Sequence, residues 1–97
     1  MLYLIVSNPK VSEDDAEVVE ARLRQKSWVE KMQKERKITS FYHRKDSDGR
    51  VAIIRTNFED DLDKFLDKWR SYVDEDFEIY PLKDPKKAEM DMAKKLF

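Results

Sequence analysis

The sequence predicts an α+β domain built on a four-stranded antiparallel sheet. Two runs rich in β-branched and aromatic residues, 38–44 and 50–56, flank the segment 46–49, which ends in the only glycine of the chain. This spacing is typical of a β-hairpin. The apolar run 2–6 and the alternating run 77–82 indicate two further strands. Helical patterns separate the outer runs from the hairpin, so the predicted order is β, α, β, β, α, β.

Length and composition predict one domain over residues 1–97. Charged residues make up 42% of the chain, but the 40% of hydrophobic residues exclude a disordered protein. A net charge of -1 with mixed signs argues against nucleic-acid and membrane partners. There is no cysteine, and no stretch has the features of a secretion signal or a membrane span. We therefore expect a soluble cytoplasmic protein.

The first strand and helix follow from the N-terminal third. The run 2–6 is apolar throughout, which indicates a central strand buried on both faces. Ser12 and Asp15 form a start similar to a capping box, and basic residues close the predicted helix near Arg36. The apolar residues of this helix fall on two sides. One side should cover the sheet, and the other needs a second partner.

The hairpin and second helix occupy the middle of the chain. Gly49 is expected to take the positive φ that closes a tight turn. Asn57 is a candidate N-cap, followed by acidic residues. Apolar residues then recur with helical spacing, at Leu62, Phe65, Leu66 and Trp69. We interpret Trp69 as a core residue and the charges between these positions as a solvated face.

A fourth strand and a last helix complete the chain. The run 77–82 alternates, and Pro81 cannot donate a hydrogen bond, so the strand ends there or leaves that position unpaired. Asp84 and Pro85 are typical of an N-cap and a first helical position. A mildly amphipathic helix is therefore expected from Pro85 to Phe97.

This order of elements is the ferredoxin-like arrangement, in which two helices cover one face of the sheet. Alternation makes the other face apolar too, and we expect it to carry Tyr3, Ile5, Tyr80 and Leu82. A monomer rarely exposes such a patch. Either the last helix folds back over it, or two copies place their sheets face to face. We expect the second, with the 85–97 helix packing on the partner and a ligand in the enclosed space.

The chain resembles the dimeric α+β barrel superfamily, and within it the muconolactone-isomerase-like proteins. The resemblance spans residues 2–85 and is greatest over 28–85, which includes FEDDLDKFLDKW and FEIYPLKDP. It implies a homodimer or a larger ring. In the isomerase it implies a proton shift on a small unsaturated lactone without metal or organic cofactor. The isomerase has a proline-containing bend after its second helix, whereas segment 70–76 has no proline, and no catalytic motif transfers to named positions.

His43 is the only histidine, so a multi-histidine metal site is excluded. If it faces the enclosed space, it is the best candidate for proton transfer, because its reference pKa lies near 6.5. The alternative is a solvated strand histidine. Tyr3 and Tyr80 are candidates for lining the same space, either to orient a ligand or as plain packing.

No metal or cofactor is expected. The segment 46–49 does not continue as a calcium loop, and one glycine cannot build a nucleotide-binding loop. Segments 50–58 and 7–11 lack the residues of RNA-recognition strands and of an acylphosphatase cradle. We therefore expect a protein that binds a small apolar or aromatic molecule, in the manner of a cofactor-free isomerase. The alternative is a noncatalytic sensor or assembly module that acts through its dimer surface.

Overall fold

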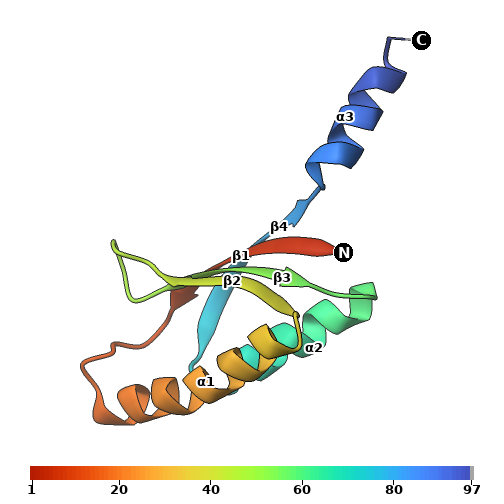
Figure 1. The fold of residues 1–97 in the computed structure, drawn as a ribbon. Coiled ribbons are helices and arrows are strands. Elements are labelled where there is room, and N and C mark those ends of the chain that lie inside the picture. The colour runs from red at the N-terminus through yellow and green to blue at the C-terminus, as the bar shows by residue number, and fades with distance from the viewer. Residues whose placement is uncertain (97) are drawn as a thin grey trace.

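The computed structural model describes residues 1–96 and has the predicted order of elements (Figure 1). A sheet in the order β2-β3-β1-β4 is antiparallel throughout. The fold is therefore ferredoxin-like α+β, with one added helix. Its strands are β1 (Leu2–Pro9), β2 (Ile38–His43), β3 (Arg50–Arg55) and β4 (Glu75–Leu82), and its helices are α1 (Ala16–Lys34), α2 (Glu59–Arg70) and α3 (Pro85–Lys94).

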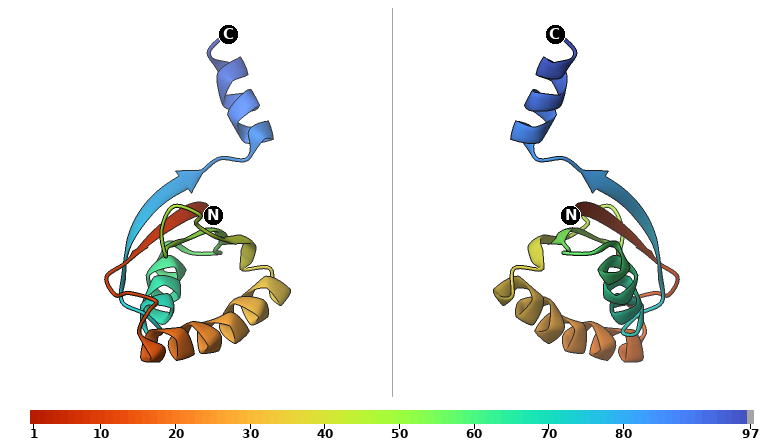
Figure 2. Two further views of the ribbon diagram at one scale, coloured as in Figure 1. Left: turned by 90° about the vertical axis from the view of Figure 1, so that its left-hand side faces the viewer. Right: turned by 90° about the vertical axis from the view of Figure 1, so that its right-hand side faces the viewer.

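Helices α1 and α2 lie together on one side of the sheet, which we call the covered face (Figures 1 and 2). The core lies between these two layers. Ile5, Ala52 and Ile54 from the central strands are fully buried there, against Trp69 and Leu66 of α2. Trp69 has no exposed surface, so its prediction as a core residue is confirmed.

Gly49 does not have the positive φ that the turn pattern predicts. Glycine is required at this position because the turn passes close to the backbone of β1, where a Cβ would overlap the carbonyl oxygen of Ser7. Ser7 is itself buried, and its hydroxyl oxygen accepts a hydrogen bond of 2.7 Å from the backbone N–H of Arg50. The turn is thus pressed against β1.

The ends of α1 differ from the prediction by a few residues. Asp15 is the N-cap, and its carboxylate accepts from the Glu17 N–H at 2.9 Å. Ser12 caps the preceding turn, where its hydroxyl oxygen accepts from the Asp14 N–H at 3.1 Å. Beyond the other end, Arg36 has a φ of 61°, the one positive φ among residues 1–96. Such a residue is common just after a helix.

The later elements begin close to their predicted positions. Phe58, rather than Asn57, is the N-cap residue of α2, and its N–H donates to the Asp61 carboxylate at 3.2 Å. Strand β4 begins at Glu75 and runs along the sheet edge beside β1. The predicted cap of α3 is confirmed, since Asp84 accepts from the Lys86 N–H at 2.9 Å. The predicted last residue of that helix, Phe97, lies outside the described residues.

The expected side for Tyr3 and Ile5 is wrong. Tyr3 pairs with Ile54 and Ile5 with Ala52, so both point toward the helices. Alternation divides a strand into two sets but does not say which set the helices cover. The opposite side, which we call the open face, carries an apolar set formed by Leu2, Leu4, Val6, Tyr42, Val51, Ile53, Tyr80 and Leu82.

Helix α3 leaves the body on the side away from α1 and α2 (Figures 1 and 2). None of its residues is buried. The radius of gyration is 15.7 Å, against about 13 Å for a compact chain of this length. The helix therefore does not fold back over the open face, and its packing on a second copy stays a prediction. Within residues 1–96 no helix combines the length and the apolar character that crossing a membrane requires.

Candidate functional site

A cavity of about 410 Å³ lies between α1 and the hairpin strands β2 and β3. We call it the His43 cavity. Small-molecule sites commonly enclose about 300 to 1,000 Å³, so its size suits a compact ligand. Helix α1 contributes polar and apolar side chains, and the strands contribute an aromatic ring and two nitrogen-bearing groups. The residues used below are Arg22, Gln25, Val29, Phe41, His43 and Arg50.

A buried ion pair forms one end of this region. Both nitrogens of the Arg22 fork donate to the Glu75 carboxylate, at 3.1 and 2.8 Å. The indole N–H of Trp69 donates to the same carboxylate at 2.6 Å. Glu75 is 1% exposed and Arg22 is 9% exposed. Bidentate geometry and the indole bond compensate the desolvation of the two charges, so the pair fixes where the Arg22 guanidinium lies.

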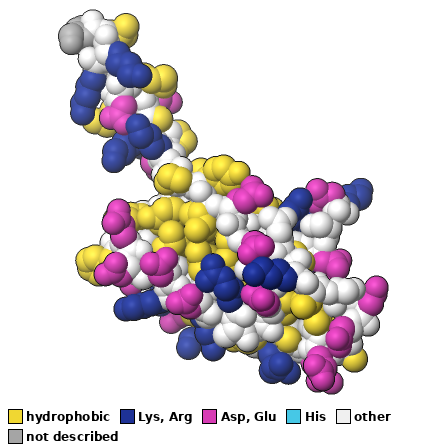
Figure 3. Space-filling model, turned by 180° about the vertical axis from the view of Figure 1, so that it is seen from behind, with side chains coloured by type: hydrophobic (Ala, Val, Ile, Leu, Met, Phe, Trp, Pro, Cys, Tyr) yellow, Lys and Arg dark blue, Asp and Glu magenta, His cyan; other side chains and the backbone are white. Residues whose placement is uncertain are grey.

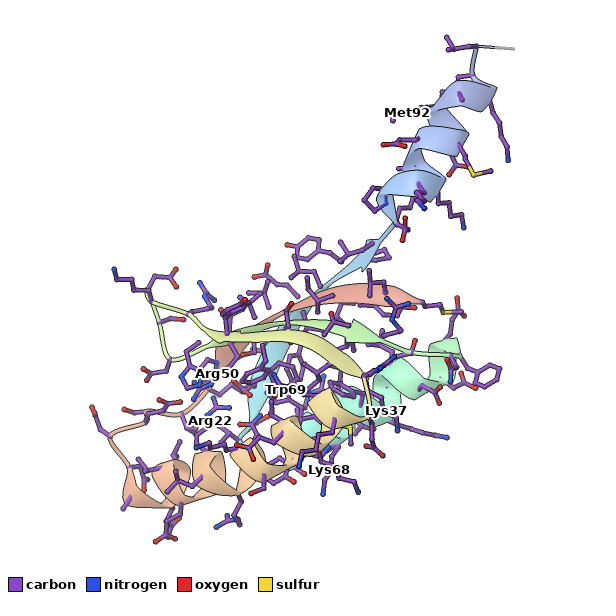
Figure 4. All side chains as sticks on the ribbon, in the orientation of Figure 1. Arg22, Lys37, Arg50, Lys68, Trp69 and Met92 are labelled. Carbon is purple, nitrogen blue, oxygen red and sulfur yellow. The ribbon has the colours of Figure 1, made fainter. Side chains whose placement is uncertain are left out.

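Glu13 joins this pair to the hairpin. Its Oε1 accepts from Arg22 Nε at 3.0 Å and from Arg50 Nη1 at 2.6 Å. Arg50 Nη1 also donates to the Asp48 carbonyl. Figure 4 shows Arg22 and Arg50 between helix and sheet at the same end of the molecule. Among residues 1–96, both side-chain bonds of Arg50 use Nη1, which leaves its Nε and Nη2 donors for another partner.

Gln25 lines the cavity and has a buried donor without a partner among residues 1–96. It is 2% exposed, and its Oε1 accepts from Arg22 Nη1 at 2.8 Å. Arginine can only donate, so this bond fixes which end of the amide is oxygen. The amide nitrogen Nε2 therefore points away from Arg22, and it has no hydrogen-bond partner within residues 1–96. A buried donor without a partner costs about 1–3 kcal/mol, which a ligand oxygen would recover.

His43 stands exposed at the mouth of the cavity, opposite Arg50 in the strand register. Its ring meets Phe41 edge-on, with centroids 6.3 Å apart. Partial burial lowers the pKa of His43 below its ordinary 6.5, and the positive charges of Arg50 and Arg22 lower it further, against an opposing effect of Glu13. The imidazole is therefore neutral at pH 7 and able to accept a proton.

The three residues predicted for the site do not lie together. His43 is on the covered face and lines the cavity. Tyr3 is on the same face, but it packs against the core. It lies four residues along β1 from Ser7, the residue of that strand that is hydrogen-bonded to Arg50. Tyr80 is on the open face, where its hydroxyl donates to Glu78 at 2.9 Å and this bond raises the pKa of Tyr80. Neither tyrosine lines the cavity.

The sequence interpretation missed most of the site. Arg22, Gln25, Glu75 and Arg50 are all buried polar residues, a type that usually lies on the surface. One signal was present, because Arg22 and Gln25 share the helical phase of Ala21 and Trp28. Polar residues inside an apolar stripe indicate a buried polar cluster. The partner Glu75 carries no such signal, since it lies 53 residues from Arg22.

Among residues 1–96, no three histidine, cysteine or acidic side chains gather in a way that would hold a metal ion. The sequence matches no curated protein. A family model described as a domain of unknown function, DUF3303, matches residues 1–96. The match covers nearly the whole chain, and the chain therefore belongs to the DUF3303 family.

Proposed function

We propose that the protein binds a small organic acid or lactone in the His43 cavity and acts as a homodimer. The observation that carries the proposal is made at Gln25, which lines the cavity and whose buried amide nitrogen has no hydrogen-bond partner among residues 1–96. Buried donors in native proteins nearly always have an acceptor. A ligand oxygen is the acceptor that this position lacks.

The groups around the cavity select the chemistry of the ligand. Arg50 and Gln25 offer N–H donors, and neutral His43 offers one donor and one acceptor. Val29 and Phe41 supply apolar walls. A ligand with a carboxylate or lactone carbonyl would accept hydrogen bonds from these donors, and its apolar or aromatic body would pack against Val29 and Phe41.

Binding is tested by thermal shift and calorimetry with a panel of small lactones and aromatic acids. A ligand at a hundredfold excess over its Kd adds about 2.7 kcal/mol to the free energy of unfolding. The Gln25→Met variant keeps the shape but removes the amide, and Arg22 retains its bonds to Glu75. We expect this variant to fold and to lose most of the shift. Exposed Glu20→Gln is the matched control on α1. A panel that stabilises neither protein contradicts the proposal.

A cofactor-free proton shift is the activity that we propose for this site. His43 would take a proton from a carbon beside the carbonyl held by Arg50 and return it to another carbon, so no oxidant is consumed. The pKa of His43 is lowered from 6.5, so the neutral ring, which is the form that accepts a proton, predominates at pH 7. The resemblance to muconolactone-isomerase-like proteins points to the same reaction. The His43→Ala variant should lose about 10²–10⁴-fold in turnover and keep ligand affinity within a few fold.

The open face and α3 support the homodimer. Tyr42 and Tyr80 are 68% and 48% exposed on that face, and Met90 and Met92 of α3 are 62% and 58% exposed. Figure 3 shows hydrophobic side chains gathered where α3 leaves the body. A second copy supplies a matching sheet and a matching helix, whereas nothing in residues 1–96 of the same chain covers this face.

A noncatalytic assembly module is the second candidate function, and the same apolar face favours it. The two candidates differ at His43. If assembly is the whole function, His43→Ala leaves the dimer mass unchanged and the wild-type protein has no turnover to lose. If the cavity is a reaction site, the variant stays dimeric but its turnover is lost.

A further inference from the structure

A second cavity, of about 510 Å³, lies between the C-terminal half of α1 and helix α2, next to the segment that joins β3 to α2. We call it the basic cavity. Figure 4 shows two of its lysines, with Lys37 toward the end of the molecule away from Arg22 and Arg50 and Lys68 nearer the middle of the helix layer. Five cationic side chains line it, against the two carboxylates of Glu35 and Asp61. The cationic residues are Arg36, Lys37, Arg55, Lys64 and Lys68.

These cations have no anionic partner within residues 1–96. The ion pairs of the described chain lie elsewhere and include none of the five. Asp61 accepts from the Phe58 backbone instead, and Lys68 lies over the Tyr72 ring at 5.1 Å. The negative end of the α1 dipole accounts for Lys37 and its neighbour, and that of α2 accounts for Lys68 in its last turn, but neither accounts for Lys64. The cavity therefore has a positive potential that attracts an anion.

Thr56 adds an unpaired group. It is 7% exposed and lines the cavity, and its hydroxyl has no hydrogen-bond partner among residues 1–96. It stands three residues before the first residue of α2. Phosphate is commonly held by a hydroxyl together with cationic side chains. Both kinds of group line this cavity.

An aromatic floor lies beside the charges. Trp28 and Phe65 both line the cavity, with ring centroids 4.9 Å apart and planes tilted by 45°. Each ring is 9% exposed, so a limited part of its surface remains open. A ring on the ligand has a place to pack next to the cations.

The backbone at Arg36 points to the same site. The left-handed conformation, with a φ of 61°, suits glycine better than arginine. It is held by hydrogen bonds from the Arg36 N–H to the Gln33 carbonyl at 3.1 Å and from the Lys37 N–H to the Met32 carbonyl at 2.9 Å. A large cationic side chain at such a position supplies charge to the cavity at the expense of local stability.

We infer that the basic cavity binds a small phosphate ester with an aromatic ring. The phosphate lies among the Arg36, Lys64 and Thr56 groups, and the ring packs against Trp28 and Phe65. This site is separate from the His43 cavity and does not depend on the function proposed there.

The test is calorimetric titration of the full chain with 1-naphthyl phosphate, inorganic phosphate and 1-naphthol. We expect binding in the order 1-naphthyl phosphate, then phosphate, then naphthol, and weaker binding at higher salt because the charges are exposed. No binding of either phosphate compound overturns the inference. Equal binding of naphthol and its phosphate also overturns it, because the cations then contribute nothing.

Three variants test the residues. Arg36→Gly removes a charge and relieves the backbone, and Thr56→Val removes a buried unpaired hydroxyl. Both should melt at or above the wild-type temperature and bind 1-naphthyl phosphate at least about tenfold more weakly. Exposed Lys64→Gln should weaken binding without a change in melting temperature, and exposed Lys86→Gln on α3 is the matched control. Wild-type affinity in all three cavity variants overturns the inference.

Discussion

The two faces of the sheet differ in what covers them and in the residues they carry. On the covered face, charged residues are buried, and each of Arg22, Glu75 and Arg50 has partners supplied by the chain itself. On the open face the central residues are apolar and lack a covering layer. The covered face is packed against two helices of the same chain, whereas the open face has no such layer within residues 1–96, and we propose that a second copy covers it. Changes to the first should therefore affect folding, and changes to the second should affect assembly.

Removal of Glu75 should have the largest effect. The Glu75→Ala variant leaves buried Arg22 without its bidentate partner, with only the Glu13 carboxylate remaining, and leaves Trp69 without an acceptor. We expect a loss of about 3–5 kcal/mol in the free energy of unfolding, measured by urea denaturation. Exposed Asp76→Ala, which breaks a surface pair with Lys10, is the control and should cost less than about 1 kcal/mol. Similar losses in both variants would contradict a buried pair.

The second-largest effect should come from a charge placed in the open face, which should weaken assembly. Ile53 lies on that face in the central strand β3, so an Ile53→Lys change places a charge in the proposed interface. A central interface residue contributes about 2 kcal/mol or more, so the dimer Kd should rise about thirtyfold. Size exclusion with light scattering measures the change over a dilution series. Exposed Glu20→Lys on α1 should leave the Kd unchanged.

The Gly49→Ala change should have a smaller effect. The added methyl group meets the Ser7 carbonyl and forces the turn away from β1. Such overpacking costs about 1–3 kcal/mol in unfolding free energy. Lys45→Ala, at an exposed position near the same turn, is the comparison. If the two variants melt at the same temperature, the close approach has no energetic role.

The pH dependence from His43 should be the smallest effect. The folded chain holds the pKa of His43 below 6.5, so the unfolded chain binds the proton more readily. This contribution to stability is complete above about pH 6.5 and is lost as the pH falls through the lower folded pKa. Wild type should therefore lose more stability between pH 7 and pH 5 than His43→Gln does. The opposite difference would mean that the folded state favours the charged ring.

The order of elements was predictable because each depends on local patterns. The stripe ending at Trp69 and the Asp84-Pro85 start of α3 both lie where the sequence placed them. The face of Tyr3 was not predictable, because a strand that is apolar on both sides has no polar side to mark solvent. The cavity depends on contacts between distant segments, such as Arg22 with Glu75, which periodicity cannot reveal. Only the polar residues within the α1 stripe gave a signal.

Sedimentation equilibrium of the unmodified chain tests the central claim most directly, namely that a second copy completes the open face. The single chain has a mass of 11.7 kDa. We predict a mass twice this value, or a larger even multiple, at micromolar concentrations. A single-chain mass at every concentration, in a protein that remains folded and soluble, would contradict the claim.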